Sequence, residues 1–304
     1  MTQESRPNGL PAGGVEPRAQ RRALERAAAT YDEAAVLAHE VAARMRERLD
    51  LMQVRPERLL VTDARAGADA RALAEPFPKS RKTLVDPAPA MLTEARRRRP
   101  RWRHRQELCA ARTPALPFPA QTFGMAWSNL GLQWEDDLDA ALGELHRVVA
   151  PQGLLLFSSL GPDTLTELRT ALATVFGEAA PELPLFLDMH DVGDALTRAG
   201  FEGVVMENET ITVTYPDLAA LLRDARATAS GALLRERRRG LLTPRQWRAL
   251  EAALPRVEDR LPARFEVVYG HAWRGERPGS AADAGGVARI GLDQIGRSGG
   301  GGAR

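Results

Sequence analysis

Residues able to bind a small molecule gather in three short segments, each directly after or within a hydrophobic run. These are VTDARAG at 61–67, LVDPAPAML at 84–92 and SNLGLQW at 128–134. A carboxylate at the end of a buried strand, such as Asp86, can accept hydrogen bonds from both hydroxyls of a ribose. Alternatively, Asp86 caps a helix or closes a turn before Pro87. The sequence presents no Ser-His-Asp, paired-carboxylate or metal-binding constellation beside these segments.

The elements that must position these segments alternate between strand and helix. Strands are expected at 58–62, 82–86, 123–129, 153–160, 203–214 and 265–273. Helices are expected at 19–49, 68–75, 89 to the arginine run, 137–149, 162–176, 190–199, 216–227 and 244–254. This alternation predicts an α/β fold with a mostly parallel sheet flanked by helices, in which the last strands pair antiparallel. Ligands of such sheets bind beyond the carboxyl ends of the strands, where the three segments lie.

Length and composition predict one main domain. The chain has 304 residues, of which 44% are hydrophobic, enough for a substantial core. We expect a disordered N-terminal tail at 1–18 and a glycine-rich C-terminal tail at 274–304. The domain then spans 19–273, with helical insertion or lid elements near 19–50 and 162–200.

Charge and cysteine content indicate which partners and which cellular compartment to expect. Forty-two basic and 40 acidic residues give a net charge of +2, so nucleic-acid binding is not expected. Arginines cluster at 96–105 and 235–239, as a solvated face or as a docking site for an acidic partner. The single cysteine, Cys109, suits a reducing cytosol. Neither a secretory signal nor a membrane span is visible, which favours a soluble cytoplasmic protein.

Four further segments carry a family resemblance together with the first three. They are AAATYDEAA at 27–35, GPDTLTELR at 161–169, DMHDVGDAL at 188–196 and LPARFEVVYGHAW at 261–273. From about residue 20 to 273 the chain resembles the malonyl-acyl-carrier-protein O-methyltransferases of biotin synthesis. These are class I methyltransferases with a Rossmann-like fold. A weaker resemblance links it to complex I assembly factors of the same fold, at least one of which is a hydroxylase.

The resemblance implies transfer of a methyl group from S-adenosyl-L-methionine to the free carboxylate of malonyl-acyl-carrier protein. That carboxylate is ionised at neutral pH, and the sulfonium is a good electrophile. The enzyme therefore has to supply alignment, exclusion of water and a counter-charge rather than acid-base catalysis or a metal. The implied partner is an acidic carrier protein, and a monomer is expected.

The resemblance also assigns residues to the cofactor. Asp86 would bind the ribose beside Pro87, and Met91 would pack against the adenine, although Met91 also suits a plain core position. Ala110 stands where an acidic partner for the adenine amino group is expected. Asn129 would lie near the methionine moiety and the transferred methyl group, or would instead cap the following helix.

Other residues match family positions near the acceptor. Tyr31 and Asp32 resemble an N-terminal lid over the cofactor, and Tyr31 is alternatively an aromatic on a buried helix face. Gln133 and Trp134 would shape the pocket. Four further candidates have either a binding role or an ordinary structural one. A cap or surface pair is the alternative for Asp163, Arg169 and His190. Docking of the carrier protein is the role considered for Arg147, with a solvated face as its alternative.

The first segment departs from the family pattern of an acidic residue, a spacer and three alternate glycines. Val61 takes the acidic position, Asp63 and Arg65 take the first two glycine positions, and only Gly67 remains. Side chains there add strain and obstruct the methionine end of the cofactor. Three hypotheses therefore stay open: a working methyltransferase, a catalytically inactive relative that binds a partner, and an assembly-factor-like protein.

Overall fold

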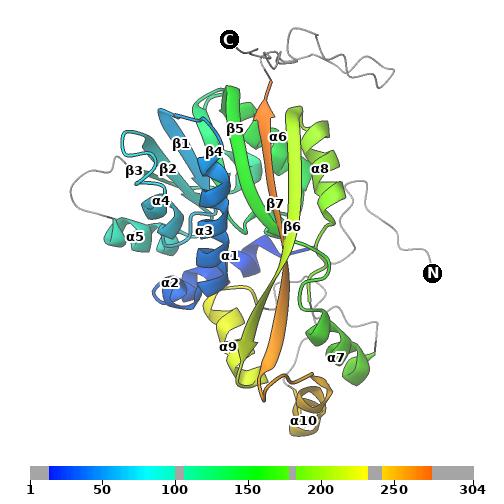
Figure 1. Ribbon diagram of the computed structural model, residues 1–304. Helices are drawn as coiled ribbons and strands as arrows, with labels where there is room; N and C mark the ends of the chain where they lie inside the picture. Colours follow the sequence, from blue (N-terminus) through cyan, green and yellow to red (C-terminus); the bar gives the residue numbers. More distant parts are fainter. Residues whose placement is uncertain (1–13, 100–105, 178–182, 232–241, 276–304) are drawn as a thin grey trace, which may run out of the picture.

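The computed structural model describes residues 14–99, 106–177, 183–231 and 242–275. Within them one seven-stranded sheet runs through the molecule (Figure 1). Its strands are β1 (Arg58–Thr62), β2 (Arg81–Asp86), β3 (Gln106–Ala110), β4 (Phe123–Ser128), β5 (Val149–Leu160), β6 (Phe201–Tyr215) and β7 (Leu261–Arg274). Their order is β3-β2-β1-β4-β5-β7-β6.

The pairing confirms the predicted fold class. β1 pairs in parallel with β2 and β4, and the parallel region continues to β3 and β5. β7 pairs antiparallel with both β5 and β6, as expected for the last strands. The chain order reverses beside β1, so the carboxyl ends of β1 and β4 form the switch point at which such sheets bind ligands.

The helices begin at residues that favour helix starts. Pro89 stands in the first turn of α5, Asp137 caps α6 by accepting from the Ala140 amide, and Thr243 forms a capping box with Gln246 at α10. The helices longer than one turn are α1 (Pro17–Ala27), α3 (Val36–Asp50), α4 (Ala68–Ala72), α5 (Pro89–Arg98), α6 (Leu138–Val148), α7 (Thr166–Phe176), α8 (Met189–Arg198), α9 (Leu218–Ala227) and α10 (Pro244–Ala253). The single-turn helices are α2 (Tyr31–Ala34), η1 (Thr113–Ala115) and η2 (Leu132–Trp134).

Two hydrophobic layers cover the sheet. On one face, α3, α4 and α5 pack against β1, β2 and β4 through side chains such as Met45, Leu73 and Trp127. On the other face, α6 and α8 pack through residues such as Leu142 and Leu196. Both faces of β1, β2, β4 and β5 are therefore mostly buried, which explains the nearly continuous hydrophobic runs that identified these strands.

The C-terminal part of β6 and the N-terminal part of β7 pair with each other and extend beyond the other strands. There α7, α9 and α10 gather beside them (Figure 1). A separate hydrophobic cluster joins these helices to β7, with Leu168 from α7, Leu221 from α9, Leu250 from α10 and Leu261 from β7. This region lies next to the site described below.

The N-terminal prediction was wrong in two respects. The expected helix over 19–49 is three helices, interrupted at 28–30 and at Ala35. At the first interruption, Ala27 and Ala28 are buried in a cluster with Met91 and Ala229. In addition, α1 starts at Pro17, inside the expected tail. Strand β3 was not predicted; it lies at the sheet edge, where its side chains are half-buried or exposed and hydrophobic alternation is weak.

Several predictions fall wholly or mostly outside the described residues. They are the N-terminal tail up to residue 13, the arginines at 101–105 and at 235–239, and the C-terminal tail from 276. No helix in the part of the chain that the structure describes is long and apolar enough to cross a membrane.

Candidate functional site

The three segments singled out in the sequence meet at one edge of the sheet. Thr62 pairs with Ser128, and Asp86 pairs with Ala110, so the carboxyl ends of β1, β2, β3 and β4 lie side by side. The loop after β1 follows the backbone that three alternate glycines would favour. Asp63, Arg65 and Gly67 have φ values of 50°, 47° and 82°.

The Asp63 and Arg65 residues therefore put conformational strain into this loop. A non-glycine residue in the left-handed region costs roughly 1 kcal/mol or more. The remaining glycine is needed for close packing, since a Cβ on Gly67 would lie 2.9 Å from the Cβ of Ala95. The loop thus has a positive φ at three alternate positions, and only one of them holds a glycine.

Arg65 directs its side chain onto Asp86 and Asp63. Its Nη1 lies 3.0 Å from Asp86 Oδ2 and 3.3 Å from Asp63 Oδ1. The Arg65 amide donates to the same Asp86 oxygen at 3.0 Å. All three residues are buried. A buried guanidinium between two carboxylates is strongly stabilised in this position, because removing one partner leaves an uncompensated buried charge.

The pKa directions agree with this arrangement. Burial disfavours the charged Arg65 guanidinium, but Asp86 and Asp63 outweigh it and raise the pKa of Arg65. Burial raises the pKa of Asp63, and Arg65 opposes that shift. One Asp63 oxygen, Oδ2, is buried without a hydrogen-bond partner. The cluster therefore depends on Arg65 for its charge balance.

Asp86 closes a turn, as one of its alternatives predicted. Its Oδ1 accepts from the Ala88 amide two residues on, at 2.8 Å. Ala88, rather than Asp86, is the N-cap of α5. With Oδ2 held by Arg65, both oxygens of this carboxylate have partners within the chain.

Asn129 joins four elements. Its Nδ2 donates to Ala38 O at 2.9 Å and to Asp69 Oδ1 at 3.3 Å, and its Oδ1 accepts from the Ser158 hydroxyl at 2.9 Å. Asp69 also accepts from the Trp127 indole at 3.1 Å. The helix-capping alternative is wrong, because the N-cap of η2 is Gly131. Asn129 stands at the strand edge with its amide engaged by the protein itself.

Arg112 and Glu135 form a second charged pair beside the loop. Arg112 Nη2 lies 2.7 Å from Glu135 Oε2. Burial and the nearby Asp63 carboxylate raise the pKa of Glu135 to about 7, against the opposing effect of Arg112. Glu135 thus places a carboxyl group with a raised pKa at the edge of the site.

The N-terminal helices cover this edge. Asp32 Oδ2 binds Arg71 Nη2 at 2.6 Å and Arg98 Nη1 at 3.0 Å, which fixes α2 to α4 and α5. Tyr31 borders the cavity described below, and burial raises the pKa of its hydroxyl while Arg65 lowers it. The position over the site fits a lid, and Tyr31 also packs against the cluster of Leu24 and Met91.

The remaining cofactor candidates are spread around Asp86. Met91 is fully buried in that cluster, as its core alternative predicted. Pro87 is half-buried next to it, and Ala110 lies opposite Asp86 with an exposed side chain. An acidic partner for an adenine is therefore absent at Ala110 itself.

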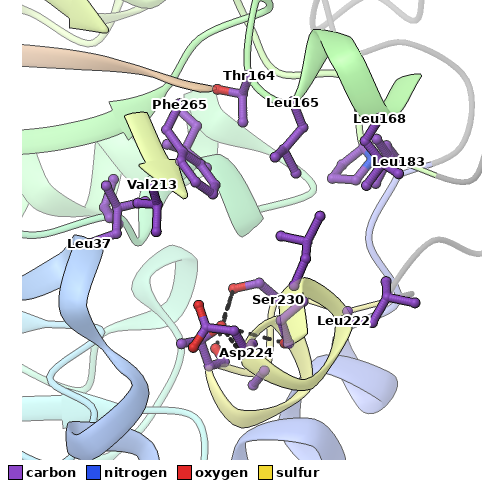
Figure 2. A pocket seen from close by; sticks show the side chains of 18 of the residues that line it. Leu37, Thr164, Leu165, Leu168, Leu183, Val213, Leu222, Asp224, Ser230 and Phe265 are labelled. Carbon is purple, nitrogen blue, oxygen red and sulfur yellow. Dashed lines mark hydrogen bonds between the residues drawn. The ribbon is translucent and has the colours of Figure 1, made fainter. Parts of the chain in front are cut away.

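A cavity of about 360 Å³ opens beside the loop. Arg65, Gln133 and Trp134 border it from the sheet, and helices α7 and α9 border it from the far region. Figure 2 shows Leu165 and Leu168 on one side, and Leu222 and Asp224 of α9 on the other. Most of the lining is hydrophobic, as in pockets that exclude water from a ligand.

Three acceptor candidates reach this cavity. Gln133 donates to Leu130 O at 2.9 Å and leaves its Oε1 buried without a partner. Trp134 packs edge-to-face on Phe186, with ring centroids 5.9 Å apart. Arg169 donates to Pro184 O at 3.0 Å and has no carboxylate within salt-bridge distance among the described residues.

Three other candidates do not line the described cavity. The Arg147 guanidinium binds Glu144 at 2.6 Å and the carbonyl oxygens of Leu116 and Phe118. His190 is exposed at the start of α8, with Nδ1 2.6 Å from Asp188 Oδ1. Asp163 is exposed, and its amide donates to Glu266 at 2.9 Å. The structure does not bring these residues to the site.

Sequence reasoning did not assign the roles of four charged residues at this site. They are Arg65, as the salt-bridge partner of Asp86, and Asp69, Arg112 and Glu135. Glu135 directly follows the third segment, and Arg112 lies two residues after Ala110. Their position after strand ends was the available signal. Within the described ranges, no cluster of three or more His, Cys, Asp or Glu side chains could hold a metal ion.

Comparisons with known proteins agree with the fold. Residues 63–157 match the model of a methyltransferase domain. The YcgJ protein of Bacillus subtilis has a similar structure, with a TM-score of 0.55 and 12% identity over 77% of this chain and 98% of its own. An N-methyltransferase from Haemonchus contortus, solved with S-adenosylhomocysteine, has a TM-score of 0.53 and 16% identity over 84% of this chain and 60% of its own.

Curated relatives are much more similar in sequence. A malonyl-[acyl-carrier protein] O-methyltransferase of Laribacter hongkongensis is 45% identical over 265 residues, 84% of this chain and 88% of its own. The protein of the same name from Halorhodospira halophila is 42% identical over 281 residues, 91% of this chain and 94% of its own.

Proposed function

Because this chain belongs to the malonyl-[acyl-carrier protein] O-methyltransferase family, we propose that it binds a malonyl thioester of an acyl-carrier protein and esterifies its free carboxylate. Family membership confirms the resemblance found in the sequence and favours the methyltransferase hypothesis over the assembly-factor hypothesis. The cofactor of this family is S-adenosyl-L-methionine, which supplies the methyl group.

The observation that carries the proposal for the acceptor is the cavity beside the loop. The end of the acceptor that enters the site joins an uncharged thioester to a malonyl carboxylate with one negative charge. The cavity matches this distribution, with leucines from α7 and α9 along its walls and Arg169 among its lining residues. Water exclusion by such walls strengthens any charge interaction inside.

Arg169 is our candidate counter-charge for the malonyl carboxylate. Burial lowers its pKa, yet a guanidinium remains charged at neutral pH. Its hydrogen bond to Pro184 O leaves guanidinium donors for a bidentate contact with a carboxylate. The acidic residue of the cavity lining, Asp224, accepts from the Tyr215 hydroxyl at 2.7 Å.

Gln133 and Trp134, which also line the cavity, support this assignment. The unpartnered Gln133 Oε1 can accept from an amide of the thioester arm. Trp134 offers a flat apolar surface to the same arm. Their roles are binding and orientation; no proton has to move, because the carboxylate is already ionised.

The experiment that tests this function separates acceptor binding from methyl transfer. Malonyl-loaded acyl-carrier protein is titrated into the full chain by calorimetry, with acetyl-loaded carrier as a comparison. We expect the malonyl form to bind at least tenfold more tightly, and Arg169→Gln to remove that preference. The matched control is Arg198→Gln, which alters an exposed pair with Asp139.

Transfer is then measured by mass spectrometry of the carrier at millimolar cofactor, and by growth of a biotin-requiring strain. Equal binding of malonyl and acetyl carriers contradicts the proposal. Purification from cells that recovers a respiratory subunit in place of a carrier protein supports the assembly-factor alternative.

A further inference from the structure

We propose that Arg65 is an internal competitor of the cofactor: its guanidinium occupies the carboxylate of Asp86, so S-adenosylmethionine binds only when Arg65 moves away. The inference concerns the cofactor side of the site and rests on family membership, independently of the acceptor proposed above. In the arrangement described, the residues do not fit the cofactor, because Asp86 Oδ2 already accepts from the Arg65 amide and from its guanidinium.

Position is the first argument. Arg65 stands on the loop after β1, and Asp86 ends β2, so the side chain crosses the carboxyl edge of two adjacent parallel strands. In open α/β sheets this crevice holds the sugar and neighbouring groups of a nucleotide ligand. Arg65 also lines the cavity that α7 and α9 border.

Charge is the second argument. The sulfonium and amino groups of the cofactor are positive, and the Arg65 guanidinium is a further positive charge, buried at the carboxyl edge of the strands where such sheets bind ligands. Val61 stands where the family has the acidic residue, so it provides no compensation for those groups. Like charges at short distance in a poorly solvated site repel strongly.

The strength of the internal contact is the third argument. Arg65 makes a salt bridge with Asp86 and another with Asp63, and each of the three side chains is buried. A ligand that displaces Arg65 must find a new environment for that guanidinium. The internal contact keeps the conformation that can bind the cofactor rarely populated. The apparent affinity for the cofactor is therefore lower by the free energy needed to break that contact.

The test needs a variant that removes the competitor without leaving two unpaired carboxylates. D63G/R65G does so, because it deletes one carboxylate with the arginine and places glycine at φ values of 50° and 47°. Binding of S-adenosylmethionine and S-adenosylhomocysteine is measured by calorimetry and by thermal shift. We expect the double variant to bind both ligands at least tenfold more tightly than the wild-type chain.

Two further variants make the result specific. D63G/R65G/D86N tests whether the gain depends on the freed carboxylate, and it should lose most of that gain. Arg81→Gln removes a positive charge near the opposite end of β2, where Arg81 lies 3.6 Å from Glu107, and should bind like the wild type. Circular dichroism confirms that each variant folds.

Several outcomes overturn the inference. They are wild-type binding as tight as that of the double variant, a folded double variant that gains nothing, and a gain that persists without Asp86. Failure of the malonyl carrier to bind sinks the proposed acceptor but leaves this titration unaffected, so the two proposals fail separately.

Discussion

The Ser158 hydroxyl at the end of β5 donates to Asn129 Oδ1 at the end of β4, over 2.9 Å. The same hydroxyl oxygen accepts from the Leu130 amide at 3.0 Å. Because Asn129 also binds Ala38 and Asp69, this pair fixes the edge of the sheet to α3 and α4. The candidate site is thus built on a closed hydrogen-bond network.

Asn129→Ala should lower the free energy of unfolding by about 2 kcal/mol, because Ser158 and Asp69 lose a partner in a buried place. Urea denaturation measures the change. Asn208→Ala, on the exposed side of β6, is the control and should change stability by less than about 0.5 kcal/mol. A loss at Asn129 no larger than at Asn208 contradicts the network's importance.

Gly131→Ala should destabilise the chain through Asp63. A Cβ on Gly131 would come within 2.7 Å of the Asp63 Cβ, although the backbone there, with φ of −108°, accepts any residue. We expect a loss of about 1–3 kcal/mol, as for overpacking of a buried position. Thermal or urea unfolding measures it.

A double-mutant cycle identifies the clash. In a D63G background the alanine at position 131 should cost little, whereas additive effects contradict the proposed contact. Gly143→Ala is the matched control. Apart from its own turn of α6, no part of the described chain lies within 4 Å of the new Cβ, and alanine should stabilise that helix by up to about 1 kcal/mol.

Asp32→Asn should loosen the helices over the site. It weakens the pairs with Arg71 and Arg98, which join α2 to α4 and α5. We expect a loss of about 1–3 kcal/mol and faster amide hydrogen exchange in Tyr31–Ala34. The control, Glu25→Gln, weakens an exposed pair within α1 and should have almost no effect. Unchanged exchange in α2 argues against the coupling.

Stability should fall as pH rises through the titration of Glu135. Its pKa in the folded chain is about 7, above the ordinary 4.5, so between these values the folded state binds more protons than the unfolded state. The contribution is fully present below pH 4.5 and lost above about 7.

The measurement compares free energies of unfolding at pH 5 and pH 8. The glutamine of Glu135→Gln does not titrate. From pH 5 to pH 8 the free energy of unfolding of this variant should therefore decrease by about 2 kcal/mol less than that of the wild type. Glu47→Gln, at an exposed position on α3, should keep the wild-type difference. Parallel profiles for wild type and Glu135→Gln refute the assignment.

The sequence by itself determined the α/β alternation and the location of the site. Strands buried on both faces need long hydrophobic runs, so β1, β2, β4 and β5 were visible as such. Because parallel strands end at one edge, the three polar segments had to meet there. The family resemblance also rested on residues alone, and the relatives' identity supports it.

Tertiary structure decided what local patterns leave undetermined. β3 forms at an edge because β2 offers it a partner, and the expected N-terminal helix is divided into three, with Ala27 and Ala28 buried against other elements at the first break. Sequence register showed that Arg65 replaces a glycine, but the direction of its side chain depends on where β2 places Asp86. Residues 21 positions apart meet only when two strands pair, and this pairing brings the Arg65 guanidinium onto the Asp86 carboxylate.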